Sequence, residues 1–579
     1  MGTPELPVPD GLVLRPFRGV RFAVEDPAKV TSPPYDLISD ADVDALLRRH
    51  PNNVVRLILP CSPRGNSSVK PSPPSNQPLP TASLSPGNTE PASRQPAASE
   101  QPHLSRADTS DPRLRPPHPA RPGLGPTGSA TPAHPGQTNA SPAHPEGTAL
   151  ESADLERIDS AAADQAAPAP GQAAPRTTGS EPAGPGSTGS KAAGLGAANT
   201  ERSSVPLEVR YTEARDTLRA WLDAGILVPD EVPALYVYEQ SGPDTMQRGL
   251  IGDVGLADPG QHIILPHEDV MPGPIADRLA LMSTTQANLE PIFLLYDGTD
   301  GTATRLVDEV ATKRRPLMSA HTEDGLTHRL WAITEESEIA AINADLHDRQ
   351  ALIADGHHRY ATYRVLQRQE RVTHGPSREG HPTPATAGAL VAPWDFGLAL
   401  LVDSTAYPPD LKAIHRVIPG LPLAEATAKA RKSWRVQDYD DLSKGLAALE
   451  NATEPAFLLA DEKGAHLLTD PDPVELAHAM PADHSDRWNS LNTSILTEFI
   501  LPRVWGMRDD DQAVRIVHHD TAAAVRLATR TGGTAVILRP LATEDVLAVA
   551  AGGERVPRKS TSFGPKPRTG LVLRTFAID

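Results

Sequence analysis

A long stretch without aromatic residues constrains the fold of this 579-residue chain more than any other feature. Residues 61–200 hold 25 of the 61 prolines and none of the 23 Phe, Trp and Tyr residues. Such a segment cannot bury enough apolar surface to offset the entropy of ordering it. Because a long surface loop costs little additional free energy to extend, we expect a disordered Pro/Gly/Ala/Ser-rich insertion over 61–204, inside a folded domain.

The segments on both sides of this insertion have the patterns of a globular domain. A strand-like run precedes it and a helix-like run follows it, so residues 1–60 and 205–389 are expected to form one interrupted core domain. The pattern changes near residue 390, which predicts a C-terminal α/β lobe over 390–579. The mixture of strands and helices favours an α/β or α+β fold.

Hydrophobic periodicity and turn residues predict the individual elements. Helices are predicted over 39–49, 211–222, 276–285, 335–347, 423–433, 441–450, 521–529 and 543–551. Strands are predicted over 53–59, 234–238, 250–254, 291–296, 351–354, 396–402, 455–459, 514–517 and 534–538.

Composition and charge argue against several classes of function. The formal net charge of -18 opposes binding to nucleic acid and to anionic membranes. The chain has no long uncharged apolar run typical of a membrane span, and residues 1–7 lack the pattern of a secretion or lipidation signal. The single cysteine, Cys61, cannot form an internal disulfide, which fits a reducing compartment. We therefore expect a soluble cytoplasmic protein.

The segment Asp355-Gly356-His357-His358-Arg359 is the sharpest local signal in the sequence. A glycine lets the backbone approach a ligand closely, and a helix that starts there presents unpaired N–H groups to an anion. An arginine adds donors suited to phosphate oxygens. Asp355 is either a Mg²⁺ ligand or a helix cap. A phosphate or nucleotide site is the favoured interpretation, and a transition-metal site or a purely structural cap with solvated histidines stay open.

Two further segments carry groups that suit phosphate chemistry, and a third polar segment has a structural interpretation. Glu268 follows Pro266 and His267 in a loop, where its carboxylate is either a general base or a solvated loop acid. The segment Lys559-Ser560-Thr561 supplies a cation and two hydroxyls, although a basic loop of this kind is more often solvated surface. The segment His518-His519-Asp520 lies between a predicted strand and a predicted helix, and we interpret it as a helix cap.

Six motifs resemble those of an uncharacterised bacterial family of domains of unknown function. The resemblance extends over nearly the whole chain outside the insertion. It is carried by residues 16–19, 33–36, 55–60, 236–239, 354–360 (Ala-Asp-Gly-His-His-Arg-Tyr) and 553–561.

A more distant resemblance to the ADP-dependent free-serine kinase of the ParB/sulfiredoxin-like superfamily is carried by three segments in the same order, 266–268, 355–359 and 553–561. It implies a nucleotide-binding core of that type with additional α/β lobes. By this resemblance Glu268, Asp355 and Arg359 are catalytic. Asp355 is in addition the candidate metal ligand, because a carboxylate beside a phosphate site suits Mg²⁺. The residues implied to bind the nucleotide are Gly356, His357, His358, Lys559, Ser560 and Thr561. The implied cofactors are Mg²⁺ and ADP or ATP.

These observations favour a nucleotide-dependent, serine-kinase-like phosphotransferase that acts on the hydroxyl of a small molecule such as a hydroxy-amino acid. A non-catalytic, ParB-like nucleotide-binding regulatory protein is the alternative, and hydrolysis of a phosphorylated compound is a third. The expected partners are a small-molecule substrate and a nucleotide, without nucleic acid or membrane. Glu268, Asp355, Arg359 and Lys559 are far apart in the chain, so a shared site requires that the fold bring them together.

Overall fold

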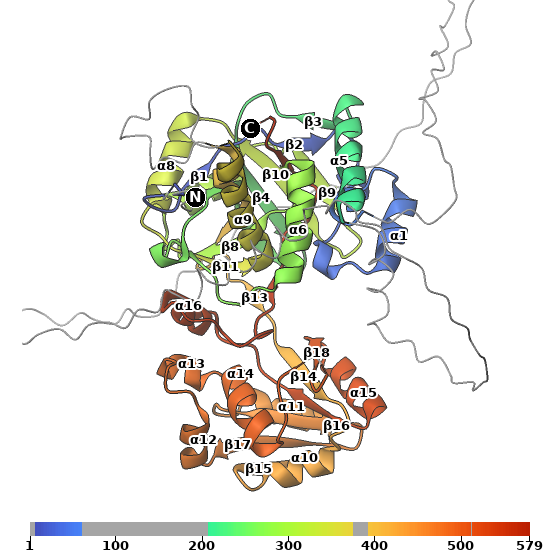
Figure 1. Cartoon of the computed structure of the whole chain (residues 1–579), viewed down its shortest axis with the longest axis vertical. Helices are drawn as coiled ribbons and strands as arrows, with labels where there is room; N and C mark the ends of the chain where they lie inside the picture. Colours follow the sequence, from blue (N-terminus) through green and yellow to red (C-terminus); the bar gives the residue numbers. More distant parts are fainter. Residues whose placement is uncertain (1–5, 8, 61–206, 375–391, 511, 579) are drawn as a thin grey trace, which may run out of the picture. The chain divides into compact units, whose positions relative to one another are not determined.

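The computed structural model describes residues 6–7, 9–60, 207–374, 392–510 and 512–578 (Figure 1). Helices combine with two large β-sheets, which confirms the expected α/β (α+β) class. The insertion predicted over 61–204 lies outside the described residues. Within the described part of the chain, no helix combines the length and the apolar character needed to cross a membrane.

The first sheet has nine strands and mixed directions. β11 pairs in parallel with β6, and β8 pairs in parallel with β12, whereas the other neighbours are antiparallel. β1 (Leu14–Arg15) pairs with β5 outside the main order. The main order is β6 (Ile264–Leu265), β11 (Ala351–Asp355), β8 (Ile292–Tyr296), β12 (Phe396–Asp403), β5 (Met246–Gly255), β4 (Leu235–Ser241), β10 (Thr327–Ile333) and β9 (Met318–His321).

Both faces of this sheet are covered, which explains the continuous apolar run in β8. Ile292 and Leu294 join one core cluster, and Phe293 and Leu295 join the other, because successive side chains of a strand point to opposite faces. Part of α16 (Thr543–Ala551) packs on the second face. The first face is covered by α6 (Pro272–Thr285), α7 (Thr302–Lys313), α8 (Glu336–Leu346) and α9 (His357–His374).

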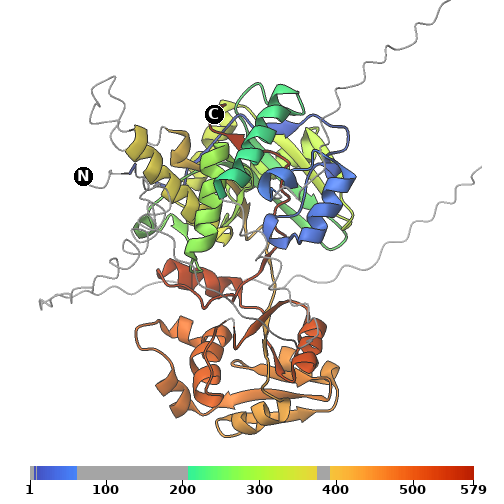
Figure 2. The same ribbon diagram turned by 45° about the vertical axis from the view of Figure 1, so that its right-hand side comes forward.

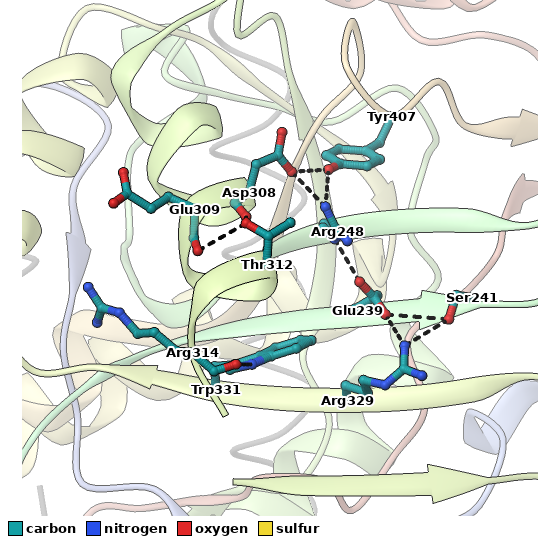
Figure 3. A network of polar contacts seen from close by, with 10 residues as sticks. All are labelled: Glu239, Ser241, Arg248, Asp308, Glu309, Thr312, Arg314, Arg329, Trp331 and Tyr407. Atoms are coloured by element: carbon teal, nitrogen blue, oxygen red, sulfur yellow. Dashed lines mark hydrogen bonds and ion pairs between the residues drawn. The ribbon is translucent and has the colours of Figure 1, made fainter. Parts of the chain in front are cut away.

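A charged network ties α7 to the first face of the sheet (Figure 3). Glu239 of β4 is 2% exposed and accepts hydrogen bonds from Arg248 of β5 at 2.7 Å and from Arg329 of β10 at 2.5 Å. Arg248 also donates to Asp308 of α7 at 3.0 Å. The buried carboxylate is therefore compensated by two guanidinium groups, as burial of a charge requires.

The residues before and after the predicted insertion pack together. β2 (Val20–Phe22) pairs with β3 (Leu227–Pro229), and residues of both segments share one core cluster with α5 (Leu207–Asp223). The same N-terminal part holds η1 (Pro27–Lys29), η2 (Tyr35–Leu37) and α1 (Asp40–Arg49). The α1 helix was predicted, and Ser39 caps it.

The strand predicted over 53–59 is wrong. The segment forms a short helix, α2 (Val55–Ile58), which packs against α5. Val55, Leu57 and Ile58 are all buried there, so the apolar run reflects a helix surrounded by packing partners. Periodicity alone does not distinguish a buried strand from a buried helix in so short a run.

The second sheet has six strands, and all its neighbours are antiparallel. Its order is β15 (Trp434–Tyr439), β17 (Gly464–Pro471), β16 (Phe457–Asp461), β19 (Thr534–Ile537), β14 (Ile414–Ile418) and β18 (Arg515–His518). One face packs against α10 (Leu423–Ala430), α14 (Asn492–Ile495) and the π-helix η6 (Leu496–Val504). The other face packs against α11 (Leu442–Glu450) and α15 (Thr521–Thr531). Two further helices, α12 (Pro473–Ala479) and α13 (Asp486–Ser490), follow β17 in the chain and precede α14.

The last residues of the chain pack against the first sheet, where Phe563, Leu571 and Val572 join the core cluster of its second face. β21 (Arg574–Thr575) pairs with β7 (Ala287–Asn288), and β20 (Phe563–Gly564) pairs with β13 (Asp410–Leu411). Figures 1 and 2 show the red C-terminal end among the blue, green and yellow elements. Because β12 also belongs to the nine-stranded sheet, the boundary expected at residue 389 does not coincide with a boundary between the two sheets.

Arg574 anchors this returning segment, and its removal is a test of the fold. Its side chain is fully buried and lies 2.7 Å from Asp253, with a further hydrogen bond of 3.0 Å to Asn288. Arg574→Ala should lower the free energy of unfolding by about 3–5 kcal/mol, because it leaves a buried carboxylate undercompensated. Arg435→Ala, which breaks an exposed pair with Asp470, should change it by less than about 1 kcal/mol. Equal effects of the two variants in denaturant unfolding would contradict this role of Arg574.

Candidate functional site

The site is built around the connection between β11 and α9. Asp355 ends the buried strand, and α9 begins at His357. Gly356 between them has a φ of +97°, and a Cβ there would lie 2.9 Å from Ile292 Cγ2. Both the backbone conformation and the space therefore require glycine. The predicted strand-to-helix connection is confirmed.

A cavity of about 910 Å³ opens at this connection. Its lining residues come from the N-terminal part, α5, the 268–278 region, the 354–359 segment, His518 and His519, and the C-terminal segment 559–566. The predicted site residues that line it are Glu268, Asp355, Gly356, His357, His358, Arg359, Lys559 and Thr561. The four distant residues whose convergence the shared site required, Glu268, Asp355, Arg359 and Lys559, are among them.

Ser560 is the exception among the predicted residues. It is buried, its Oγ donates to the carbonyl oxygen of Pro557, and it is not among the lining residues. Its hydroxyl proton is thus used to hold the loop. The prediction that Ser560 binds nucleotide does not fit this placement.

Glu268 belongs to a chain of hydrogen bonds with Thr561 and His267. Thr561 Oγ1 donates to Glu268 Oε1 at 2.9 Å, and His267 Nε2 lies 2.8 Å from the same Oγ1. Because the hydroxyl has a single proton, the imidazole Nε2–H is the donor to Oγ1. Burial raises the pKa of Glu268, although Thr561 and Lys559 favour the carboxylate. Burial lowers the pKa of His267 to about 3, so its ring is neutral.

The two histidines at the start of α9 hold the loop that carries Glu268. His357 Nε2 accepts a hydrogen bond from the His267 backbone at 3.2 Å, and His358 Nε2 accepts one from Met271 at 3.1 Å. Burial lowers the pKa of both imidazoles, and neighbouring cations lower it further, so both rings suit the acceptor role. These nitrogens are therefore engaged by backbone, whereas the sequence predicted that both residues bind nucleotide.

Arg359 and Asp355 pair with each other. Arg359 is 4% exposed, and its guanidinium donates to Asp355 Oδ2 at 2.6 Å and to the Pro291 carbonyl at 2.6 Å. Lys566 lies 2.5 Å from the other oxygen, Asp355 Oδ1. Both carboxylate oxygens thus face cations of the protein, which does not fit the Mg²⁺ ligand that the sequence predicted. Among the described residues, no group of three or more His, Cys, Asp or Glu side chains is arranged to hold a metal ion.

Among the cations that line the cavity, Lys559 is the one whose positive charge is left for a ligand. Four other cations line the cavity, and each pairs with a carboxylate: Arg210 and Arg278 with Asp277, Arg359 with Asp355, and Lys566 with Asp36 and Asp355. Within the described ranges, the exposed Lys559 has no such carboxylate partner. Its φ is +58°, and Arg416 donates to its carbonyl oxygen at 2.9 Å, which holds the loop in this rarely adopted conformation.

The sequence did not single out several residues of the cavity as functional. Asp36 is the last residue of the 33–36 motif, but that motif did not mark it as a member of a site, and no local pattern marks Lys566. His518 and His519 were interpreted as part of a helix cap. The cap of α15 is Asp520 alone, whose side chain accepts from Ala523, whereas the two histidines line the cavity.

The low pKa of His267 predicts a loss of stability in acid. Between pH 6.5 and 3 the unfolded chain protonates this ring and the native protein does not, so stability falls as the pH is lowered through this range. From pH 7 to pH 5 the contribution of His267 is about 2 kcal/mol. His267→Gln should reduce this dependence in denaturant unfolding, and the exposed His478→Gln should preserve it. An identical pH dependence in wild type and His267→Gln would contradict a neutral, buried His267.

Comparisons with known proteins place the chain in a family. Among curated proteins, none matches it significantly. Three solved structures show a weak overall similarity, each with a TM-score below 0.3. A free serine kinase in complex with AMP has a TM-score of 0.28 at 12% identity, covering 58% of this chain and 96% of that one.

The second is a conserved hypothetical protein from Pyrococcus furiosus, with a TM-score of 0.28 at 11% identity, covering 58% of this chain and 100% of that one. The third is SbnI from Staphylococcus aureus, truncated at its C-terminus. SbnI has a TM-score of 0.26 at 12% identity, over 54% of this chain and 82% of that one. Residues 14–71 and 195–494, more than half of the chain, match the family described as protein of unknown function DUF1015, and the chain belongs to that family.

Proposed function

We propose that this protein is a nucleotide-dependent phosphotransferase that transfers a phosphoryl group from ADP or ATP to the hydroxyl of a small molecule such as a hydroxy-amino acid. One observation carries the proposal: Glu268, the residues that begin α9 and Lys559 all line one cavity. Its volume of about 910 Å³ is in the range of pockets that enclose a small ligand, roughly 300–1,000 Å³.

The start of α9 supplies the phosphate end of the proposed site. The first N–H groups of a helix have no acceptor within the helix, and Gly356 has no side chain to cap them. The aligned peptide dipoles of an 18-residue helix add a partial positive charge at the same place. Lys559 adds a full positive charge whose flexible stem can follow the phosphoryl group during transfer.

Glu268 is the general base of the proposed reaction. Its carboxylate takes the proton of the acceptor hydroxyl while the hydroxyl oxygen forms a bond to the terminal phosphorus. The bond between this phosphorus and the bridging oxygen breaks, and the shortened nucleotide leaves. The raised pKa of Glu268, which burial causes, brings the base closer to neutral pH and so makes it a better proton acceptor.

The remaining predicted residues act by positioning in this proposal. His357 and His358 hold the loop of Glu268, and Arg359 holds Asp355 at the end of β11. Asp355 is not proposed as a metal ligand, because both its oxygens face cations. A divalent ion would enter with the nucleotide phosphates.

Glu268→Gln tests the proposed base. The full-length protein should form a phosphorylated product from at least one member of a panel of hydroxy-amino acids with ADP or ATP, and Glu268→Gln should reduce the turnover rate roughly 10²-fold or more. Nucleotide affinity in calorimetry should stay unchanged, because the amide keeps the shape of the side chain. Glu425→Gln, which alters an exposed pair with Lys429, is the matched control. Nucleotide binding without any product would instead support a regulatory protein.

Lys559→Ala tests the phosphate end. Loss of one charge-assisted contact should weaken nucleotide binding about tenfold to a hundredfold, and more strongly at low salt. Alanine and lysine both carry a Cβ, so the positive φ at position 559 strains the backbone equally in the variant and in the wild type. The stability of the protein should therefore not change. Lys432→Ala removes another exposed lysine and should leave the affinity unchanged. Unaltered nucleotide affinity in Lys559→Ala would remove Lys559 from the proposed site.

A further inference from the structure

Two carboxylates meet at the end of β11 and share one lysine. Lys566 Nζ lies 2.5 Å from Asp355 Oδ1, and it also donates a hydrogen bond to Asp36 Oδ2. Asp36 belongs to η2, Asp355 to β11, and Lys566 follows β20, so the three residues come from the beginning, the middle and the end of the described chain. An ammonium nitrogen in contact with two carboxylate oxygens occupies the same position that a bridging cation would take.

The arrangement is neutral, and two of its three members are largely withdrawn from water. The Lys566 side chain is 16% exposed and that of Asp355 is 15% exposed, whereas that of Asp36 is 38% exposed. Arg359 neutralises the second oxygen of Asp355, so two carboxylates face two cations. Tyr35 packs beside this group, with Arg359 5.9 Å from its ring centre. Because Lys566 contacts both carboxylates, their two like charges lie close together, and the ammonium between them offsets their repulsion.

Titration behaviour agrees with this geometry. Burial by itself raises the pKa of Asp36, yet Lys566 and Arg359 bring it below its ordinary value. Burial likewise lowers the pKa of Lys566, yet Asp355 and Asp36 raise it above its ordinary value. Both groups are therefore charged at neutral pH, and the ammonium remains between the two carboxylates.

We propose that Lys566 is the resident cation of the cavity and occupies the place of a divalent metal ion between Asp36 and Asp355. Hard divalent cations such as Mg²⁺ bind through one or two carboxylates with waters filling the other positions, and these two carboxylates would supply such ligands if the ammonium were absent. The wild-type protein therefore holds no divalent ion at Asp355. This inference concerns the protein without nucleotide and does not depend on the proposed function.

Removal of the ammonium should create a metal site. Lys566→Met keeps the length of the side chain and removes its charge, so the two carboxylates repel and the melting temperature of the metal-free protein should fall by several degrees. Millimolar MnCl₂ should restore it, and Mn²⁺ titration followed by electron paramagnetic resonance should show one bound ion that wild type lacks. Lys566→Arg keeps the cation and should melt like wild type without metal.

Two controls separate this site from non-specific binding. The double variant Asp36→Asn, Lys566→Met lacks one of the two carboxylates and should show neither the rescue nor the additional Mn²⁺ ion. Lys412→Met removes a lysine from an exposed pair with Asp410 and should give no metal-dependent change. Binding of Mn²⁺ by wild type with the same affinity as Lys566→Met would overturn the proposal. A Lys566→Met protein that stays destabilised or unfolded in MnCl₂ would overturn it equally.

Discussion

The charge balance at the end of β11 is the constraint on which the site depends. The strand is buried on both faces, and it ends in Asp355 at the edge of the core. A carboxylate in such a place requires compensation, and Arg359 and Lys566 supply it from the following helix and from the last part of the chain. The contact of Arg359 also ties the first turn of α9 to the end of the strand.

This constraint separates the side chains that contact other parts of the protein from the groups that are left for a ligand. The charged and aromatic side chains of the 355–359 segment are occupied with protein partners: Arg359 with Asp355 and the Pro291 carbonyl, and the two histidines with the Glu268 loop. The groups left for a ligand are backbone N–H groups at the start of α9 and Lys559 from a separate loop. A motif rich in polar side chains thus serves mainly to position a backbone and a carboxylate.

Much of this could be predicted from local sequence. The apolar run of β8, the glycine between β11 and α9, and the capped α1 helix follow from periodicity, backbone freedom and capping chemistry. Glu268 and Lys559 were connected to this motif only through a resemblance to a kinase, because nothing in the local pattern of either loop indicates a shared cavity. The family match ends at residue 494, so it includes Glu268 but not Lys559.

Other features depend on contacts between distant segments. The pairing of Asp36 with Lys566 joins residues 530 positions apart, and no local spacing rule describes it. The helix α2 was predicted as a strand, because the spacing of apolar residues in so short a run is the same for a buried strand and a buried helix. Which of the two forms depends on the segments that pack around it. The C-terminal lobe was predicted to begin at residue 390, but β12 (Phe396–Asp403) still belongs to the first sheet, and the strands of the second sheet follow it in the chain.

The most direct test of the central claim is a crystal structure of the protein with bound ADP or a non-hydrolysable ATP analogue. The account predicts phosphate oxygens at the backbone N–H groups that begin α9, with Lys559 beside the terminal phosphate, the Glu268 carboxylate facing it and Lys566 still between Asp36 and Asp355. Phosphates bound elsewhere on the protein, with the start of α9 in contact only with solvent, would contradict it.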